Sequence, residues 1–125
     1  EWNNVMKASE IIKADAVKNN IDPDKALRVI SQAVKNKSAV LMQENNSVLL
    51  VQKINPTSSS MHLATLDSPV ALAKSILKFV KRSKDLGIKT MYGEANNKQI
   101  VELMKRIGIN IQASDLPQYN WKANI

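Results

Sequence analysis

The spacing of apolar side chains changes along the chain from a helical period to short continuous runs. Residues 5 to 19 and residues 22 to 36 carry apolar positions three and four residues apart, which predicts two helices. Asp22 and Pro23 favour the start of the second helix. An aspartate caps the first free N–H groups of a helix, and proline suits its first position.

The middle of the chain has the pattern of three short strands. The runs Ser38–Gln43 and Ser47–Ile54 are of strand length and are separated by Asn-rich turn residues, which predicts a β-hairpin. Asn55–Ser60 contains proline and serine and is expected to be a loop. Met61–Leu66 is then expected to be a third antiparallel strand.

The C-terminal half alternates between helices and strands. The expected elements are a helix from a capping Ser68 and Pro69 to Leu86, a strand over Ile88–Gly93, a helix capped by Asn96 or Asn97 and ended by Gly108, a strand from Ile109 to Gln112, and a short final strand within Tyr119–Ile125. Together these elements predict an α/β fold in which a central mixed sheet is flanked by helices.

Composition narrows the chemistry that this fold can carry. The 125 residues are 44% apolar, which predicts a globular core and one domain over residues 1–125. The chain has no cysteine, so disulfides, thiolate metal ligands and a thiol nucleophile are excluded. With a single histidine and scattered carboxylates, no metal site is expected. No apolar run reaches the roughly 20 residues of a membrane span.

A net charge of +7 favours acidic partners such as nucleic acid, phosphate-bearing ligands or an acidic protein face. Basic residues recur along one side of the predicted helix from Ser68, at Lys74, Lys78, Lys81 and Arg82. A solvated helix face is the simpler interpretation, and docking against an acidic protein surface or DNA is the alternative. Because no aromatic residue belongs to this basic stripe, stacking on single-stranded nucleic acid is not expected.

Few side chains offer other chemistry. His62 is a candidate general base, because imidazole exchanges a proton near neutral pH, but a surface or packed histidine is the simpler interpretation. The hydroxyls of Ser58–Ser60 have no positioned base and are expected in a solvated loop. Glu94 follows a predicted strand end and could orient an amine. Trp2 and Trp121 either cover core edges or act as interface anchors.

The order of elements resembles the fold of the GNAT family of N-acetyltransferases. The segment Asn97–Ile109 is similar to the family's Asn-x-x-Ala-[apolar]-x-Leu-Tyr-x-Lys-x-Gly-Phe motif. Asn97, Leu103 and Gly108 fit this motif, and Arg106 replaces its lysine. The resemblance implies a fold that binds acetyl-CoA, with the pyrophosphate on a glycine-rich turn at the start of a helix.

The chain departs from the family at the residues that would handle this cofactor. The family's glycine-rich turn corresponds to Leu66–Ala73, which contains no glycine. Within it, Pro69 removes an N–H donor and Asp67 adds a negative charge. Met104 aligns with the family's tyrosine, a frequent general acid, and cannot donate a proton. From these departures we expect no cofactor and no catalytic residue.

Within this fold the chain resembles the small internal virion proteins of short-tailed bacteriophages, through Thr65–Ser68 and the Gly93-x-x-Asn96 step. That resemblance implies a structural component of the virion that acts through protein contacts. The alternative is an active N-acetyltransferase in the cytoplasm. Its acetyl-CoA would bind between the strands Met61–Leu66 and Ile88–Gly93, and the cofactor-binding residues would be Val70, Ala71, Leu72, Ala73 and Asn97.

Overall fold

A computed structural model describes residues 6–94 and 98–125 of the chain. Trp2, Asn96 and Asn97 lie outside these ranges, so the roles predicted for them remain predictions. The described residues form helices and strands in the order α1 (Ala8–Lys18), α2 (Pro23–Lys35), β1 (Ala39–Glu44), β2 (Ser47–Asn55), β3 (Ser58–Thr65), α3 (Pro69–Asp85), β4 (Thr90–Gly93), α4 (Lys98–Arg106), β5 (Ile111–Ala113) and β6 (Trp121–Asn124). In these ranges no helix combines the length and the apolar character needed to cross a bilayer.

The strands form one mixed sheet in the order β1-β2-β3-β4-β6-β5. The first three strands pair antiparallel, β3 and β4 pair parallel, and β6 pairs antiparallel with both β4 and β5. The predicted α/β class with a central mixed sheet is therefore confirmed. The last strand, β6, inserts between β4 and β5, so the C-terminal strand is an interior strand of the sheet and not an edge strand.

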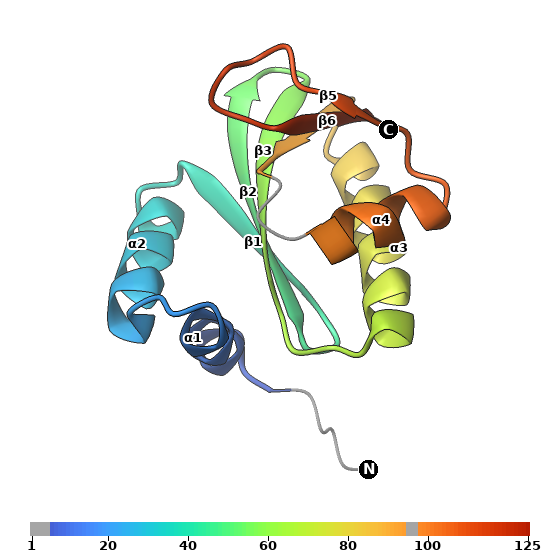
Figure 1. The fold of residues 1–125 in the computed structure, drawn as a ribbon. Coiled ribbons are helices and arrows are strands. Elements are labelled where there is room, and N and C mark those ends of the chain that lie inside the picture. The colour runs from blue at the N-terminus through green and yellow to red at the C-terminus, as the bar shows by residue number, and fades with distance from the viewer. Residues whose placement is uncertain (1–5, 95–97) are drawn as a thin grey trace.

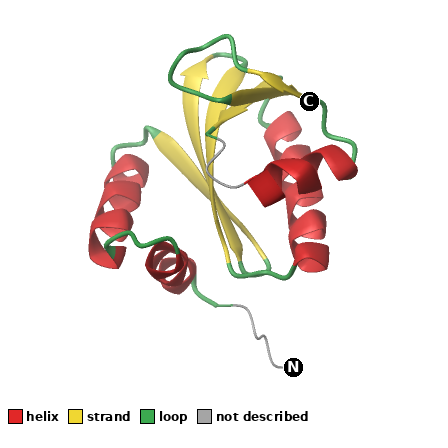
Figure 2. Ribbon diagram, in the orientation of Figure 1, coloured by secondary structure: helices red, strands yellow, loops and turns green. Residues whose placement is uncertain are grey.

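Helices cover both faces of the sheet, with α1 and α2 on one side and α3 and α4 on the other (Figures 1 and 2). On the α1 side, Ile11 and Ile12 pack against Val48 and Ala64. The α3 and α4 side holds the larger apolar cluster, in which Phe79 is 2% exposed. Alternation along the strands divides their side chains between these two clusters.

The predicted side-chain cap is present at the N-terminus of α2 and absent at the N-terminus of α3. The carboxylate of Asp22 accepts a hydrogen bond from the N–H of Asp24 at 3.0 Å, as predicted from the aspartate–proline pair. Ser68 stands at the N-cap of α3 with an extended backbone, but its hydroxyl makes no capping hydrogen bond. The prediction of a capping hydroxyl at Ser68 is wrong, and the first turn of α3 has no side-chain cap.

The predicted loop over Asn55–Ser60 is also wrong in its second half. Ser58–Ser60 belong to β3 and are 2 to 8% exposed, and only Pro56 and Thr57 form the turn. These serines pair with β2 on one side and with β4 on the other. Both neighbouring strands can accept and donate backbone hydrogen bonds at these serines. Their N–H and C=O groups therefore do not need water, and the residues can be buried.

Candidate functional site

Strands β3 and β4 pair over a short stretch and then separate. The pairs are Ser58 with Thr90, Ser59 with Met91 and Ser60 with Tyr92. Beyond Ser60, β3 continues to Thr65 without a β4 partner among the described residues, and β4 ends at Gly93. We call this point, after the pair Ser60–Tyr92, the strand divergence. It leaves backbone groups of β3 without a neighbouring strand in the middle of the sheet.

The far end of the separated part of β3 is closed by α1. The N–H of Thr65 donates to a carboxylate oxygen of Asp15 at 3.1 Å. A helix side chain therefore takes the place that a β4 residue would occupy at this end of β3. The open stretch of β3 is bounded by β4 pairing at Ser60 and by Asp15 at Thr65.

Trp121 lies across Gly93 at the strand divergence. The two residues are register partners in β6 and β4. A Cβ atom built on Gly93 would lie 2.3 Å from Cζ2 and 2.9 Å from Nε1 of the indole, so no side chain fits at Gly93. Trp121 is 8% exposed and belongs to the cluster on the α3 and α4 side. This burial favours the core-edge interpretation of Trp121 over an interface anchor.

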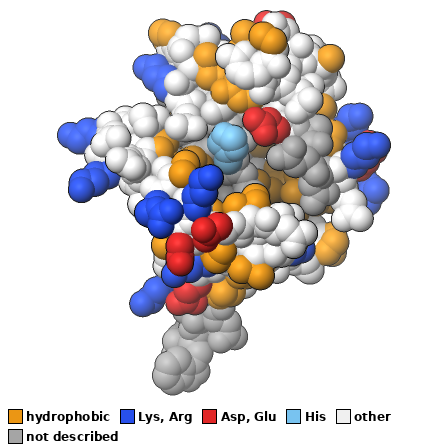
Figure 3. Space-filling view, turned by 60° about the vertical axis from the view of Figure 1, so that its left-hand side comes forward, with side chains coloured by type: hydrophobic (Ala, Val, Ile, Leu, Met, Phe, Trp, Pro, Cys, Tyr) orange, Lys and Arg blue, Asp and Glu red, His pale blue; other side chains and the backbone are white. Residues whose placement is uncertain are grey.

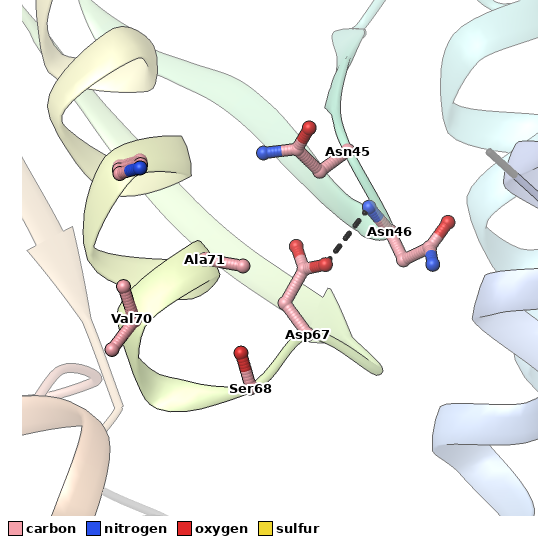
Figure 4. Close-up of a pocket in the computed structure, with 7 residues that line it drawn as sticks. Asn45, Asn46, Asp67, Ser68, Val70 and Ala71 are labelled. Carbon is pink, nitrogen blue, oxygen red and sulfur yellow. Dashed lines mark hydrogen bonds between the residues drawn. The ribbon is translucent and has the colours of Figure 1, made fainter. Parts of the chain in front are cut away.

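A pocket of about 470 Å³ lies at the start of α3 (Figure 4). It is lined by Asn45, Asn46, Asp67, Ser68, Val70, Ala71 and Lys74. The N–H groups of Val70 and Ala71 belong to the uncapped first turn, and Lys74 stands one turn further along the helix. The pocket therefore combines backbone donors and the positive Lys74, which favour an anionic group, with the carboxylate of Asp67, which opposes one.

Asp67 brings its negative charge to this pocket, as the sequence predicted, and neutral donors hold its carboxylate in place. Its carboxylate accepts hydrogen bonds from the Ser47 hydroxyl at 2.6 Å, the Asn46 N–H at 3.2 Å and the Ser75 hydroxyl at 3.4 Å. Figure 4 shows the bond to Asn46, which lies in the turn between β1 and β2. These donors hold the carboxylate against that turn and stabilise its charge.

His62 lies on the opposite face of β3 from Trp121. It alternates with Met61 of the α3 and α4 cluster and shares its face with Ala64, which packs against α1. His62 is exposed, two residues beyond the last β3–β4 pair, and Figure 3 shows the histidine in pale blue near the middle of a hollowed face. Glu94 is also exposed, directly after the end of β4.

The side chain of Tyr92 in β4 contacts the loop between β5 and β6. We did not predict this contact from the sequence. Its hydroxyl donates to Asp115 at 2.8 Å, and its ring lies 5.6 Å from the ring of Tyr119. Lys122 approaches the same carboxylate at 3.6 Å. The hydrogen bond from Tyr92 lowers the pKa of Asp115 and raises the pKa of Tyr92.

We expect Asp115→Asn to lower stability near neutral pH, with a difference from wild type that disappears in acid. Because the pKa of Asp115 is lower in the folded state, its contribution is present above the unfolded-state pKa and is lost as pH falls through the folded one. Urea midpoints at several pH values measure this. Gln112→Ala, at an exposed position in β5, is the control and should show no such convergence. A pH-independent difference would contradict the expectation.

The basic residues of α3 are all exposed, but two of them already have an acidic neighbour. Glu44 at the end of β1 lies 3.9 Å from Lys78 and 3.1 Å from Arg82. Lys74 and Lys81 make no ion pair within the described part of the chain. Docking of this face on an acidic partner remains a prediction. The described ranges also contain no group of three or more metal-ligating side chains.

The arrangement of sheet and helices is that of the GNAT acetyltransferases. N-acetyltransferase PseH from Campylobacter jejuni, solved with acetyl coenzyme A, matches with a TM-score of 0.55 and 19% identity, over 96% of this chain and 92% of that chain. The yncA protein from Salmonella typhimurium, solved with its cofactor acetyl-CoA, matches with a TM-score of 0.56 and 12% identity, over 92% of this chain and 82% of that chain. A variant of spermidine N-acetyltransferase SpeG from Vibrio cholerae matches with a TM-score of 0.57 and 10% identity, over 96% of this chain and 90% of that chain.

These structures confirm the predicted fold and overturn the predicted absence of a cofactor. PseH and yncA were solved with acetyl-CoA, which contradicts the expectation of no cofactor that we drew from Leu66–Ala73 and Met104. The finer resemblance to internal virion proteins is not supported by any of the structures named above. By sequence, no protein-family model and no curated protein matches the chain.

Proposed function

We propose that the protein is an acetyl-CoA-dependent N-acetyltransferase whose acyl donor binds at the strand divergence. The observation that carries the proposal is the separation of β3 from β4 after Ser60, in a sheet that matches those of acetyltransferases solved with acetyl-CoA. The resemblance drawn from the sequence implies the cofactor between these same two strands. On this proposal, the catalytic unit is one domain that includes all of the described residues.

The residues at the start of α3 fit the anionic end of acetyl-CoA. Two N–H groups, at Val70 and Ala71, carry no side-chain cap, and Lys74 adds a positive charge to the same pocket. Pro69 removes only one donor from this turn, and Asp67 is held by three donors of its own. The missing glycines and the Asp67 carboxylate therefore leave a weaker pyrophosphate site, in which two backbone donors and one ammonium group attract the anion.

Acetyl-CoA would supply an acetyl group activated as a thioester. In the transfer, the amine nitrogen of an acceptor forms a bond to the acetyl carbon, while the carbon–sulfur bond breaks and its electron pair leaves with sulfur. The proton that the amine loses needs an acceptor. His62 is exposed beside the strand divergence and can take it directly or through a water molecule.

Calorimetry with acetyl-CoA tests the proposal. We expect a dissociation constant below about 0.1 mM, roughly −5.5 kcal/mol. Lys74→Glu should weaken binding by about tenfold or more, because it replaces a charge-assisted contact with repulsion. Lys81→Glu is the matched control, since Lys81 is exposed on the same helix but does not line the pocket, and should change affinity much less.

One outcome would contradict the proposal, and another would contradict the role of the pocket at the start of α3. Undetectable binding of acetyl-CoA at millimolar concentration would remove its basis. An equal loss of affinity in the Lys74→Glu and Lys81→Glu proteins would show that only the net charge matters, and not the pocket at the start of α3.

A further inference from the structure

Trp121 carries a polar group with no assigned role. The residue is more than nine-tenths buried, at 8% exposure, and its indole Nε1–H has no hydrogen-bond partner in residues 6–94 or 98–125. Within those ranges, the fully enclosed side-chain atom that lacks a partner is Ser83 Oγ, so the indole N–H keeps some access to solvent. Donors in largely buried side chains are usually paired. A donor kept open for a ligand would explain this exception.

The indole N–H lies where β3 and β4 begin to separate. Gly93 is the first residue of β4 beyond the last β3–β4 pair, and a Cβ atom built on it would be 2.9 Å from Nε1. Only glycine leaves room for the ring, so the packing brings the N–H against the backbone at the strand divergence. A residue with any side chain at Gly93 would displace the ring from this place.

Among the described residues, the side chains of the cluster around Trp121 are otherwise apolar, and the nearest hydroxyl on this side of the sheet is that of Ser59, which pairs with Met91 before the strand divergence. Met104 of α4, which aligns with the tyrosine of the family motif, belongs to the same cluster as Trp121 and has only a thioether. His62 is on the opposite face of β3. Within the described residues of this cluster, the indole N–H is the polar group that lies beyond the last β3–β4 pair, at the strand divergence.

We propose that the Nε1–H of Trp121 donates a hydrogen bond to the carbonyl oxygen of the acyl thioester and distinguishes acetyl-CoA from free CoA. This inference rests on the proposed function. The indole transfers no proton. It binds the carbonyl oxygen, which is the atom that gains negative charge as an amine attacks, from the face of the sheet opposite His62.

The test is a ¹H–¹⁵N correlation spectrum of the wild-type protein with acetyl-CoA and with CoA. The two tryptophans give two indole signals, and Trp121→Phe identifies the one from Trp121 while keeping an aromatic ring over Gly93. Acetyl-CoA should move the Trp121 indole proton downfield, and CoA should not. In the Trp121→Phe protein, calorimetry should show that the affinity for acetyl-CoA falls about three- to tenfold and that the affinity for CoA is unchanged.

The outcomes separate this inference from the function on which it rests. If backbone signals of Val70 and Ala71 move with acetyl-CoA while the indole signal stays, the assignment of Trp121 is overturned and the proposed function stands. If acetyl-CoA moves no signal at all, the proposed function fails and the inference fails with it. If Trp121→Phe weakens both ligands equally, the inference is overturned, because the residue then acts through packing and not through its N–H.

Discussion

Gly93→Ala is expected to lower the free energy of unfolding by about 1–3 kcal/mol, because it overpacks the region where β4 meets β6. The added methyl group would lie 2.3 Å from Cζ2 and 2.5 Å from Cε2 of Trp121. The ring cannot simply turn away, since Trp121 is 8% exposed within the main apolar cluster. Urea denaturation followed by circular dichroism measures the loss.

Two further variants separate this clash from the ordinary cost of replacing a glycine. Gly87→Ala adds a methyl group with nothing within 4 Å, at φ +86°, so its cost is due to the backbone alone. Trp121→Val removes the ring and should make a subsequent Gly93→Ala change nearly neutral. If Gly93→Ala costs as much in the Trp121→Val protein as in wild type, the close approach of the ring to Gly93 is not the cause.

Helix boundaries could be predicted from the sequence because they depend on neighbouring residues. The Asp22–Pro23 pair starts α2, and Gly87 and Gly108 take up positive φ angles directly after helices. Strand order depends instead on contacts between distant segments. Nothing local indicates that β6 inserts between β4 and β5, so the Trp121–Gly93 pair could not be predicted.

The burial and the hydrogen-bond partners of several site residues could not be predicted, because they depend on segments that are distant in the sequence. Ser58–Ser60 follow a proline and have loop composition, yet strands on both sides bury them. The donors that hold Asp67 could not be predicted, because they come from the β1–β2 turn, from β2 and from α3, which only the fold brings together. Tyr92 and Asp115 are 23 residues apart and meet through a loop with no pattern of its own.

The divergence of β3 and β4 could be predicted only through the family resemblance. A strand pattern shows which residues are extended, but it does not show how many of them pair with a given neighbour. The register ends at Ser60 and Tyr92, although β4 continues to Gly93 and β3 continues to Thr65. The position of His62 relative to the divergence follows from this register, which explains why sequence patterns alone favoured a surface or packed histidine.

His62→Ala is expected to reduce the turnover number of amine acetylation by about 100-fold or more, with little change in acetyl-CoA affinity. The change removes the proton acceptor beside the strand divergence, and positioned general bases typically contribute at least this much. Steady-state rates with a panel of amine acceptors measure the loss, and calorimetry checks that the acyl donor still binds. His62 is exposed, so its removal should leave the unfolding free energy nearly unchanged.

A second variant distinguishes proton transfer from a positioning role. The side chain of His62→Gln can still form hydrogen bonds but cannot act as a general base, so its turnover number should fall about as far as that of His62→Ala. Wild-type turnover in either variant would assign the proton acceptor elsewhere, and Glu94, exposed at the end of β4, would be tested next.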